Sequence, residues 1–420
     1  MLQQIEGSKA IAHTVAACGT QVVSAYPISP QTHIVEELSR MVKAKELTGC
    51  EYVNVESEFS AMSACIGASA AGARTYTATA SQGLLFMVEA VYSASGLGLP
   101  IVMTVANRAI GGPINIWNDH SDTMSQRDCG WLQLFAMNNQ EAADLHVQAF
   151  RIAEELSIPV MVCMDGFILT HAVEQVDIPE PEQVKKFLPD YEPRVVLDTD
   201  DPLSLGAMVG PEAFMEVKYL QHFTQIEALN LIPQIQKDFQ EVFGRNSGGL
   251  LHEYRTEDAE TIVVCLGSVT GTVRDAIDIR REKGEKIGVV SIVSYRPFPS
   301  EAIRAALSNA KRIVVLEKAF SLGIGGIVAQ EVRMALRGNT HIEDYELIAG
   351  LGGRDITIDS INSYLDLVLA GKAEHLHFLD LDKELVEAEL KRQTENRRSG
   401  AVPENIIRDI TKRMMKGGKR

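Results

Sequence analysis

Short apolar runs rich in β-branched residues alternate, along the first part of the chain, with segments whose apolar residues recur at helical spacing. The runs carry few charges, as expected for strands covered on both faces by helices. They begin at five positions: Gln21, Tyr52, Thr75, Pro100 and Pro159. Strands separated by single helices favour a parallel sheet between two helical layers. We therefore predict an α/β fold with a doubly wound parallel sheet.

The alternation is interrupted once and then resumes. From about residue 176 to Arg255, acidic and proline-broken connections surround one amphipathic segment, Pro211 to Phe243. A second set of apolar runs and helical segments follows. This pattern predicts a first domain over residues 1–250, with a linker excursion from about 176, a smaller α/β domain over 256–371, and a C-terminal extension over 372–420.

The predicted strand Pro100 to Val105 runs into the most polar loop of the chain. Its sequence, NRAIGGPINIWNDHSD, opens with Asn107 and Arg108. Open α/β sheets bind ligands at the carboxyl ends of their strands, so we place the active site here. The planar guanidinium of Arg108 can hold a carboxylate with two hydrogen bonds. The alternative is a structural ion pair with a nearby aspartate, and the spacing alone does not decide between them.

Two other predicted strand ends carry polar groups. Ser29 lies between Pro27 and Pro30, which hold the backbone extended, so its hydroxyl either binds a ligand or satisfies the turn itself. Glu56 and Glu58 lie where a strand passes into a helix rich in Ala, Ser and Gly. A carboxylate in the first turn of a helix is stabilised by the helix dipole, so the residues alone explain either glutamate as a capping group.

Charge and cysteine content narrow the function classes. The 420 residues carry a net charge of −16, which argues against a nucleic-acid binder. Only Lys391 to Arg420 is basic, with ten Lys or Arg against three acids, and this tail is either solvated or docks on an acidic partner. The six cysteines show no C-x-x-C spacing, which indicates buried thiols of a reducing compartment. The longest uncharged stretch is broken by glycines and a proline, so we expect no membrane span and a cytoplasmic location.

The chain lacks the motifs that hold a phosphorylated coenzyme. Asp165-Gly166 has no preceding glycine, and no asparagine follows until Asn230, so the Gly-Asp-Gly and Asn magnesium–diphosphate motif of thiamine enzymes is missing. There is no Walker loop, and the glycines around Gly325 make only a weak dinucleotide fingerprint. A protein with an arginine pocket but no phosphate cradle is expected to complete its site with another chain.

Six segments together resemble one known family. In chain order they are YPISPQTHIVEEL, VESEFSAMSACIGASAAGARTYTATASQGLLFM, ANRAIGGPINIWNDHSD, RDCGWLQLF, YRPFP and GLGGRDIT. They resemble the α subunit of pyruvate:ferredoxin oxidoreductase, within the 2-oxoacid:ferredoxin oxidoreductases, over about residues 5–370. The resemblance implies a pyrimidine-type thiamine-diphosphate domain followed by a transketolase-C-like domain.

The same resemblance implies a multi-subunit enzyme. A β subunit would carry the diphosphate–magnesium motif and a [4Fe-4S] cluster, so that thiamine diphosphate is shared between α and β. Further γ and δ subunits, the δ ferredoxin-like, would carry clusters and the region that handles coenzyme A. Electrons would pass to ferredoxin or, through another subunit, to NAD. The absence of a Gly-Asp-Gly motif agrees with this division and speaks against a free-standing transketolase or decarboxylase.

The family's functional residues fall on three positions of this chain. Glu58 matches the glutamate that hydrogen-bonds the pyrimidine ring of thiamine diphosphate and promotes the imino form that deprotonates the reactive carbon. Arg108 matches the arginine that binds the substrate carboxylate. Ser29 takes the hydroxyl position of a YPITP motif in which threonine is commoner.

Substrate identity stays open at this point. Gly111 and Gly112 replace larger or hydroxylated residues found in many relatives, and with Ser29 they would widen the pocket. Pyruvate is therefore the first expectation, with an arylglyoxylate such as phenylglyoxylate or a branched 2-oxoacid as alternatives. A different class of function, a non-catalytic assembly subunit, predicts that Glu58, Arg108 and Ser29 can be changed without loss of turnover.

Overall fold

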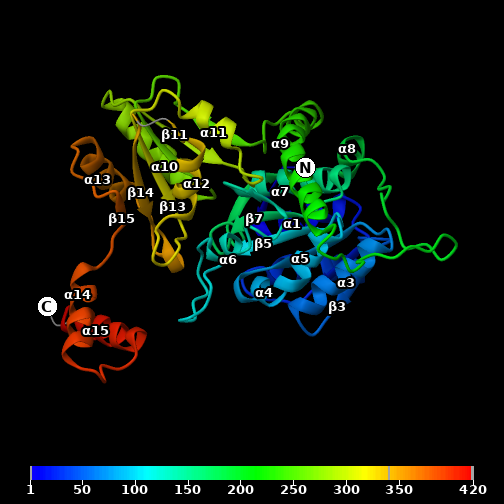
Figure 1. Ribbon diagram of the computed structural model, residues 1–420, viewed down its shortest axis with the longest axis horizontal. Helices are drawn as coiled ribbons and strands as arrows, with labels where there is room; N and C mark the ends of the chain where they lie inside the picture. The colour runs from blue at the N-terminus through cyan, green and yellow to red at the C-terminus, as the bar shows by residue number, and fades with distance from the viewer. Residues whose placement is uncertain (1, 339–340, 418–420) are drawn as a thin grey trace.

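The computed structural model of the chain describes residues 2–338 and 341–417. Figure 1 shows two α/β units side by side, each built on its own large sheet, and a helical extension that projects from the second unit away from the first. Among the described residues, no helix is long and apolar enough to cross a lipid bilayer.

The first sheet has seven strands in the order β12-β6-β7-β5-β4-β2-β3, and every pairing is parallel except that of β12 with β6. Its strands are β2 (Val22–Ala25), β3 (Glu51–Asn54), β4 (Thr75–Thr79), β5 (Val102–Asn107), β6 (Leu132–Phe135), β7 (Val160–Asp165) and β12 (Ser294–Arg296). The chain leaves β2 towards β3 and then crosses to β4 on the other side of β2. This reversal confirms the predicted doubly wound fold and puts the topological switch point between β2 and β4.

Helices cover both faces of the first sheet. One face packs against α1 (Gly7–Ala17), α2 (Thr32–Lys43), α7 (Asn139–Leu156) and the inner half of α9 (Phe214–Phe243). The other packs against α3 (Glu58–Ala70), α4 (Ser81–Phe86) and α5 (Val88–Gly96). The helix predicted in the linker excursion is therefore present as α9, and its buried residues Ile232, Ile235 and Phe239 face α7.

The second sheet has six strands in the order β15-β14-β13-β10-β11-β9, of which only β9 is antiparallel to its neighbour. They are β9 (Leu251–Tyr254), β10 (Thr261–Cys265), β11 (Ile287–Ile292), β13 (Arg312–Glu317), β14 (Glu343–Ile348) and β15 (Leu376–Phe378). One face packs against α10 (Val269–Glu282) and α13 (Ile358–Leu369). The opposite face packs against α11 (Ser300–Ala306) and α12 (Ile327–Ala335).

One hydrophobic cluster spans the two units, and each unit also has a cluster on the other face of its sheet. The cluster on the α11–α12 face continues into the α3–α5 face of the first sheet through Trp131, Phe135 and Tyr295. The strand β12 lies between β11 and α11 in the chain, yet it pairs with β6 of the first sheet. The sequence pattern of the second unit did not indicate this exchange, because a three-residue strand has no periodicity of its own.

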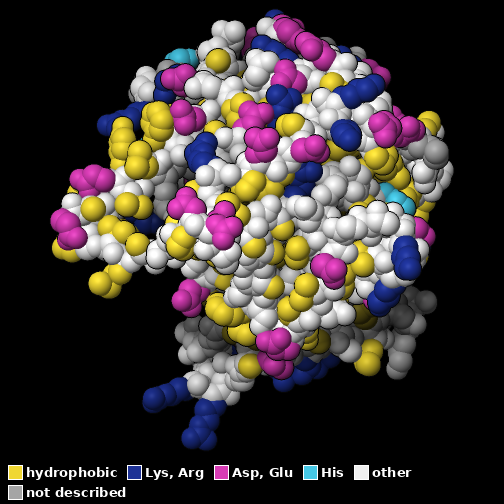
Figure 2. All heavy atoms as spheres, turned by 90° about the vertical axis from the view of Figure 1, so that its right-hand side faces the viewer, with side chains coloured by type: hydrophobic (Ala, Val, Ile, Leu, Met, Phe, Trp, Pro, Cys, Tyr) yellow, Lys and Arg dark blue, Asp and Glu magenta, His cyan; other side chains and the backbone are white. Residues whose placement is uncertain are grey.

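The remaining elements are small or peripheral. They are β1 (Leu2–Glu6) and β8 (Val173–Asp177), which pair with each other, α6 (Ser121–Ser125), α8 (Pro181–Phe187), the 3₁₀ turn at Leu351–Gly353, α14 (Lys383–Glu395) and α15 (Val402–Gly417). The last two form the projecting extension, which ends in the basic tail, and the final three residues of that tail lie outside the described part of the chain. Figure 2 shows acidic, basic and apolar side chains intermixed over one face of the protein, without a basic stripe.

Candidate active site

Two of the three residues predicted from the sequence are in direct contact, because the Ser29 carbonyl accepts from Arg108, and the third, Glu58, lies beside Gly83 in the turn after β4. Ser29 follows β2, and the turn from Ser81 to Gly83 follows β4. Arg108 follows β5, and Glu58 begins α3, which packs against β2 and β4. The site is therefore assembled from the carboxyl ends of adjacent parallel strands, where open α/β sheets bind their ligands.

The two glutamates that the sequence could not separate have different environments. Glu56 is exposed and accepts a hydrogen bond of 2.5 Å from Ser60, which lowers its pKa. Glu58 is only 7% exposed, and the adjacent Ser57, not the glutamate, caps the helix by accepting from the Ser60 backbone N–H. Within the described residues the Glu58 carboxylate has no hydrogen-bond or ion-pair partner. Ser57 therefore supplies the capping hydrogen bond, and Glu58, which lies in the first turn where the helix dipole favours its charge, has a carboxylate that is free to bind a ligand.

Gly83 makes room for the Glu58 carboxylate. A Cβ atom at this position would lie 2.7 Å from Glu58 Oε1 and 2.6 Å from Thr79 Oγ1. The hydroxyl of Thr79 is itself buried without a partner among the described residues. The Glu58 carboxyl and the Thr79 hydroxyl thus have unused hydrogen-bonding capacity, and the absence of a side chain at Gly83 leaves room beside them. Such a site fits the polar edge of a bound heterocycle.

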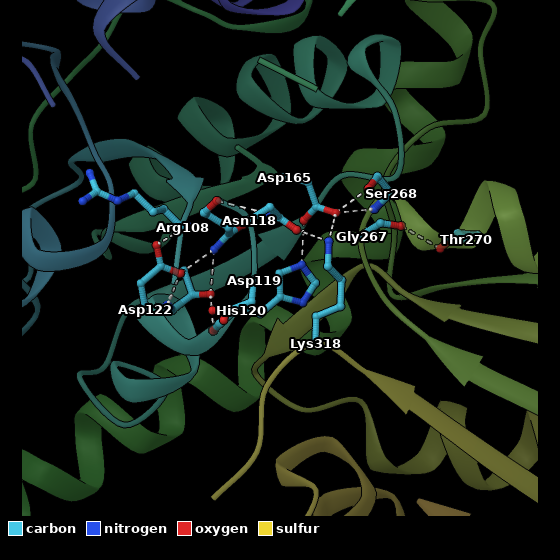
Figure 3. A network of polar contacts seen from close by, with 12 residues as sticks. Arg108, Asn118, Asp119, His120, Asp122, Asp165, Gly267, Ser268, Thr270 and Lys318 are labelled. Carbon is cyan, nitrogen blue, oxygen red and sulfur yellow. Dashed lines mark hydrogen bonds and ion pairs between the residues drawn. The ribbon is translucent and has the colours of Figure 1, made fainter. Parts of the chain in front are cut away.

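Arg108 has no carboxylate partner in the described structure. Its Nε donates to the Asn115 carbonyl at 3.1 Å and its Nη1 to the Ser29 carbonyl at 2.9 Å. The residue is 7% exposed, and desolvation by burial lowers the guanidinium pKa, although Asp122 opposes this effect. In Figure 3 the guanidinium extends away from the network that holds its backbone. The structural ion pair considered from the sequence is therefore not formed, and Nη2 remains available for an anion.

Ser29 contributes to the site first through its backbone. Its carbonyl accepts from Arg108, and the Ser29–Pro30 peptide is cis. The residue is exposed, and its hydroxyl makes no hydrogen bond to any part of the chain that the structure describes. The interpretation that this hydroxyl only satisfies its own turn is therefore not supported.

Two residues that the sequence analysis did not single out join these elements. Asp122 is fully buried and accepts from the backbone N–H groups of Ser81 and Arg108, both at 3.0 Å. Burial raises the pKa of Asp122, and the N–H donors around it oppose that rise. Ser81 donates to the Ala109 carbonyl at 2.5 Å and has φ of +47°, a conformation that few non-glycine residues adopt outside constrained sites. The only sequence signal for this junction was the Ser-Gln-Gly turn after a strand.

Of the two glycines of the Arg108 loop, only Gly112 borders the open space expected from the sequence. A Cβ atom at Gly111 would collide with the side-chain amide of Gln82, which fills the position. At Gly112 φ is +122°, so glycine is required there by the backbone. The argument for a widened pocket therefore fails at Gly111.

The same loop is joined to the second sheet by a buried polar network (Figure 3). Asp165, at the end of β7, receives His120 Nε2 at 2.6 Å and Lys318 Nζ at 3.0 Å, and Ser268 also donates to it. Burial raises the pKa of Asp165, but Lys318 and His120 outweigh this effect and hold it well below its usual value. Lys318 directly follows β13 and Ser268 precedes α10, so the second sheet supplies both donors.

A cavity of about 800 Å³ lies beside this network, between the two sheets. Its walls include Trp117 and Asn118 from the Arg108 loop, and Lys318 and Arg354 from the second unit. A separate surface group, Glu6, His33 and His171, brings one potential metal-ligand atom of each residue within 4.8 Å of the others, and is the one such group found in the described residues. Within this group, Glu6 Oε1 and His33 Nδ1 are 2.5 Å apart and share a hydrogen bond.

Comparison with known proteins agrees with the two-unit fold. Residues 13–237 match a family model described as pyruvate flavodoxin/ferredoxin oxidoreductase, thiamine diphosphate-binding. Residues 259–361 match the model of pyruvate:ferredoxin oxidoreductase core domain II. The solved 2-oxoglutarate:ferredoxin oxidoreductase from Magnetococcus marinus, with 2-oxoglutarate, coenzyme A and succinyl-CoA bound, superposes with a TM-score of 0.64 at 19% identity, covering 87% of this chain and 64% of that chain.

Several curated proteins are similar over almost their whole length. Pyruvate synthase subunit PorA of Methanosarcina barkeri is 48% identical over 390 residues, which cover 91% of this chain and 97% of that protein. The PorA subunit of Thermotoga maritima is 42% identical, with 90% and 97% covered. Ketoisovalerate oxidoreductase subunit VorA of Pyrococcus horikoshii is 40% identical, with 92% and 98% covered.

Proposed function

Because the chain belongs to the pyruvate:ferredoxin oxidoreductase family, we propose that it is the α subunit of a thiamine-diphosphate-dependent 2-oxoacid:ferredoxin oxidoreductase that acts on pyruvate. The complex would convert pyruvate and coenzyme A to acetyl-CoA and carbon dioxide, and pass two electrons to an external acceptor. Two observations carry the assignment of the site. The buried carboxyl of Glu58 has no partner in the described chain, and the guanidinium of Arg108 has no counter-ion there.

Glu58 is suited to hold the pyrimidine ring of thiamine diphosphate. When bound, this coenzyme supplies a nucleophilic carbon that attacks the 2-oxo group and delocalises the electrons left by decarboxylation. The Glu58 carboxyl, beside Gly83 and Thr79, would share a proton with a ring nitrogen and so keep the coenzyme in its reactive form. The buried surroundings strengthen this hydrogen bond, because no water competes for it.

Arg108 is suited to orient the substrate. Its Nε and Nη1 are held by the Asn115 and Ser29 carbonyls, which fix the plane of the guanidinium and leave Nη2 for the carboxylate of a 2-oxoacid. Decarboxylation removes the carboxylate that Arg108 binds, so the same residue that orients the substrate lets carbon dioxide depart. The Ser29 hydroxyl, which has no partner in the described chain, would hydrogen-bond the substrate beside it.

The surface around the site suggests that another chain covers it. Apolar side chains are exposed next to each functional element: Phe59 follows Glu58, Phe86 ends α4, and Ile114 and Trp117 belong to the Arg108 loop. Exposed apolar residues that surround a polar site are typical of subunit interfaces. The PorA relatives are named as subunits, so we propose that partner chains supply the diphosphate–magnesium motif, the iron–sulfur clusters and the electron route to ferredoxin.

The experiment is to co-express the chain with the proposed partner subunits and to assay the purified complex. We expect reduction of ferredoxin or a viologen dye that requires pyruvate, coenzyme A and thiamine diphosphate together. A panel with 2-oxoisovalerate, 2-oxoglutarate and phenylglyoxylate tests the substrate, and pyruvate should give the highest kcat/KM. A complex that reduces the dye with none of these acids would refute the proposed function. Full turnover in a complex whose α chain lacks both Glu58 and Arg108 would favour a non-catalytic assembly role.

A further inference from the structure

The second sheet uses its carboxyl edge to hold the Arg108 loop. In open α/β sheets this edge normally binds a ligand. Here the residues after three of its strands contact residues 115–122 of the first unit or the adjoining Asp165. They are Gly267 and Ser268 after β10, Lys318 after β13, and Gly352 in the turn after β14.

Lys318 is the centre of these contacts. Its ammonium donates to the Asn118 side chain and to Asp165, and its backbone carbonyl accepts from the His120 N–H at 2.9 Å. The residue is only 3% exposed. One residue of the second unit is thus tied, through its side chain, to Asn118 and to the end of strand β7, and, through its backbone, to His120.

Gly352 fixes the other end of the loop. Its N–H donates to Asp119 at 3.0 Å and its carbonyl accepts from Asn115 at 3.2 Å. A Cβ atom at Gly352 would lie 2.6 Å from the Asn115 side-chain amide, and φ is +59° there, so this contact requires glycine. Asn115 matters directly for the site, because its carbonyl holds Arg108 Nε.

These contacts form a continuous route from the second sheet to Arg108. Lys318 holds Asn118, and Asn118 donates to the Asn107 carbonyl at 3.1 Å, next to Arg108 in the chain. Within the loop, the Ala109 N–H donates to the Trp117 carbonyl at 3.0 Å. The guanidinium is therefore placed through a short loop whose distal half, residues 115–120, is bound to the second unit.

We propose that Lys318 is a positioning residue for the substrate arginine, and that the second unit, through Lys318 and Gly352, sets the geometry of the loop that carries Arg108. The effect expected on KM rests on the proposed function, whereas the effect expected on the loop itself does not. A buried ion pair adds little net stability compared with an apolar contact of the same size, and in some proteins its role is to fix one arrangement of the groups that it joins. Fixing an arrangement is what a residue that orients a substrate requires.

The test compares three variants of the α chain in the full complex. Lys318→Met removes the ammonium. The double variant Asp165→Asn with Lys318→Met removes both charges, so that no unpaired buried charge remains. Arg280→Met is the matched control, because Arg280 is also a buried cation of the second unit, paired with Glu285 and Asp366 far from the loop. Each complex is measured by hydrogen–deuterium exchange over residues 108–122, by thermal denaturation and by steady-state kinetics.

We expect both Lys318 variants to exchange the amides of Ala109 and His120 at least tenfold faster, and to raise KM for pyruvate about tenfold with a smaller change in kcat. The double variant should recover thermal stability relative to Lys318→Met without recovering KM. The Arg280→Met complex should melt earlier while loop exchange and KM stay as in the wild type. Unchanged loop exchange in both Lys318 variants would overturn the inference. If the loop amides exchange faster in the Lys318 variants but the wild-type complex does not use 2-oxoacids, only the proposed function is refuted.

Discussion

The carboxyl edges of the two sheets each carry a buried cation, but only one of the two cations has a carboxylate partner. Lys318, on the second sheet, is matched by the carboxylate of Asp165 at 3.0 Å. Arg108, on the first sheet, is nearly as buried but receives only carbonyl oxygens from the chain. Both cations bear the desolvation cost of burial, and only one is compensated by a counter-ion within the described protein.

This difference indicates that the carboxyl edge of the second sheet has a structural role and that the carboxyl edge of the first sheet binds a ligand. A buried charge without a counter-ion is tolerated where a ligand supplies the missing charge, and the same holds for the partner-free carboxyl of Glu58. The first sheet therefore offers one cationic and one acidic group to a ligand, while the buried cation of the second sheet is neutralised by Asp165 at the end of the first sheet's β7. The following substitutions test whether the distinction holds.

The largest effect is expected at Glu58. Glu58→Ala should slow proton exchange at the reactive carbon of thiamine diphosphate by about 10²- to 10⁴-fold, since a positioned acid–base group contributes that range. The measurement is deuterium exchange of that carbon in the assembled complex, followed by NMR after acid quench. Thermal stability should be unchanged or slightly higher, because the variant removes a buried carboxyl without a partner in the described structure.

Glu56→Ala is the matched control for that variant. Glu56 is two residues away, exposed, and bound only to Ser60 among the described residues. Its loss should leave coenzyme exchange within about twofold of the wild type, since a surface hydrogen bond contributes at most about 1 kcal/mol to stability and nothing to the reaction. Equal losses in the two variants would mean that helix capping, and not contact with the coenzyme, explains the effect of Glu58.

Arg108→Met should give the next largest effect. The loss of a charge-assisted contact to the substrate carboxylate costs about 3 kcal/mol, or about a hundredfold in kcat/KM for pyruvate. The loss should fall mainly on KM if the contact is made equally in the ground state and the transition state. Lys318→Met is the comparison, with its smaller, indirect effect on the same constant. A KM for pyruvate that does not change in Arg108→Met would remove the carboxylate role.

Gly83→Ala should act through Glu58. The added methyl would lie within 2.7 Å of the carboxylate and must displace it or the Thr79 hydroxyl. Alanine favours the helix α4 by about 1 kcal/mol over glycine, but overpacking beside Glu58 and Thr79 costs about 1–3 kcal/mol. Thermal stability should therefore fall only slightly, while coenzyme exchange slows about tenfold. Retained exchange would show that the carboxylate does not work from the position beside Gly83.

The sequence was sufficient for the parts of this architecture that depend on short-range pattern. The parallel sheet of the first unit followed from apolar runs between helices, and Arg108 followed from its place after the fourth of them. The sequence could not distinguish Glu56 from Glu58, because the difference is burial against α4 and not helix position. It also missed β12, Asp122 and Lys318, because each contacts a segment more than ten residues away in the chain, and a short-range pattern does not reveal such contacts.

The smallest effect is expected at Ser29, where backbone and side chain have separate roles. Ser29→Ala keeps the carbonyl that holds Arg108 and removes only an exposed hydroxyl that has no hydrogen bond in the described protein. One neutral hydrogen bond to the substrate is worth about 0.5–1 kcal/mol, so kcat/KM for pyruvate should fall about two- to fivefold, with no change in thermal stability. Ser29→Thr retains the hydroxyl and should restore the rate. If Ser29→Ala instead matched the loss in Arg108→Met, the substitution would have disturbed the carbonyl contact, and exchange at the Arg108 loop would reveal it.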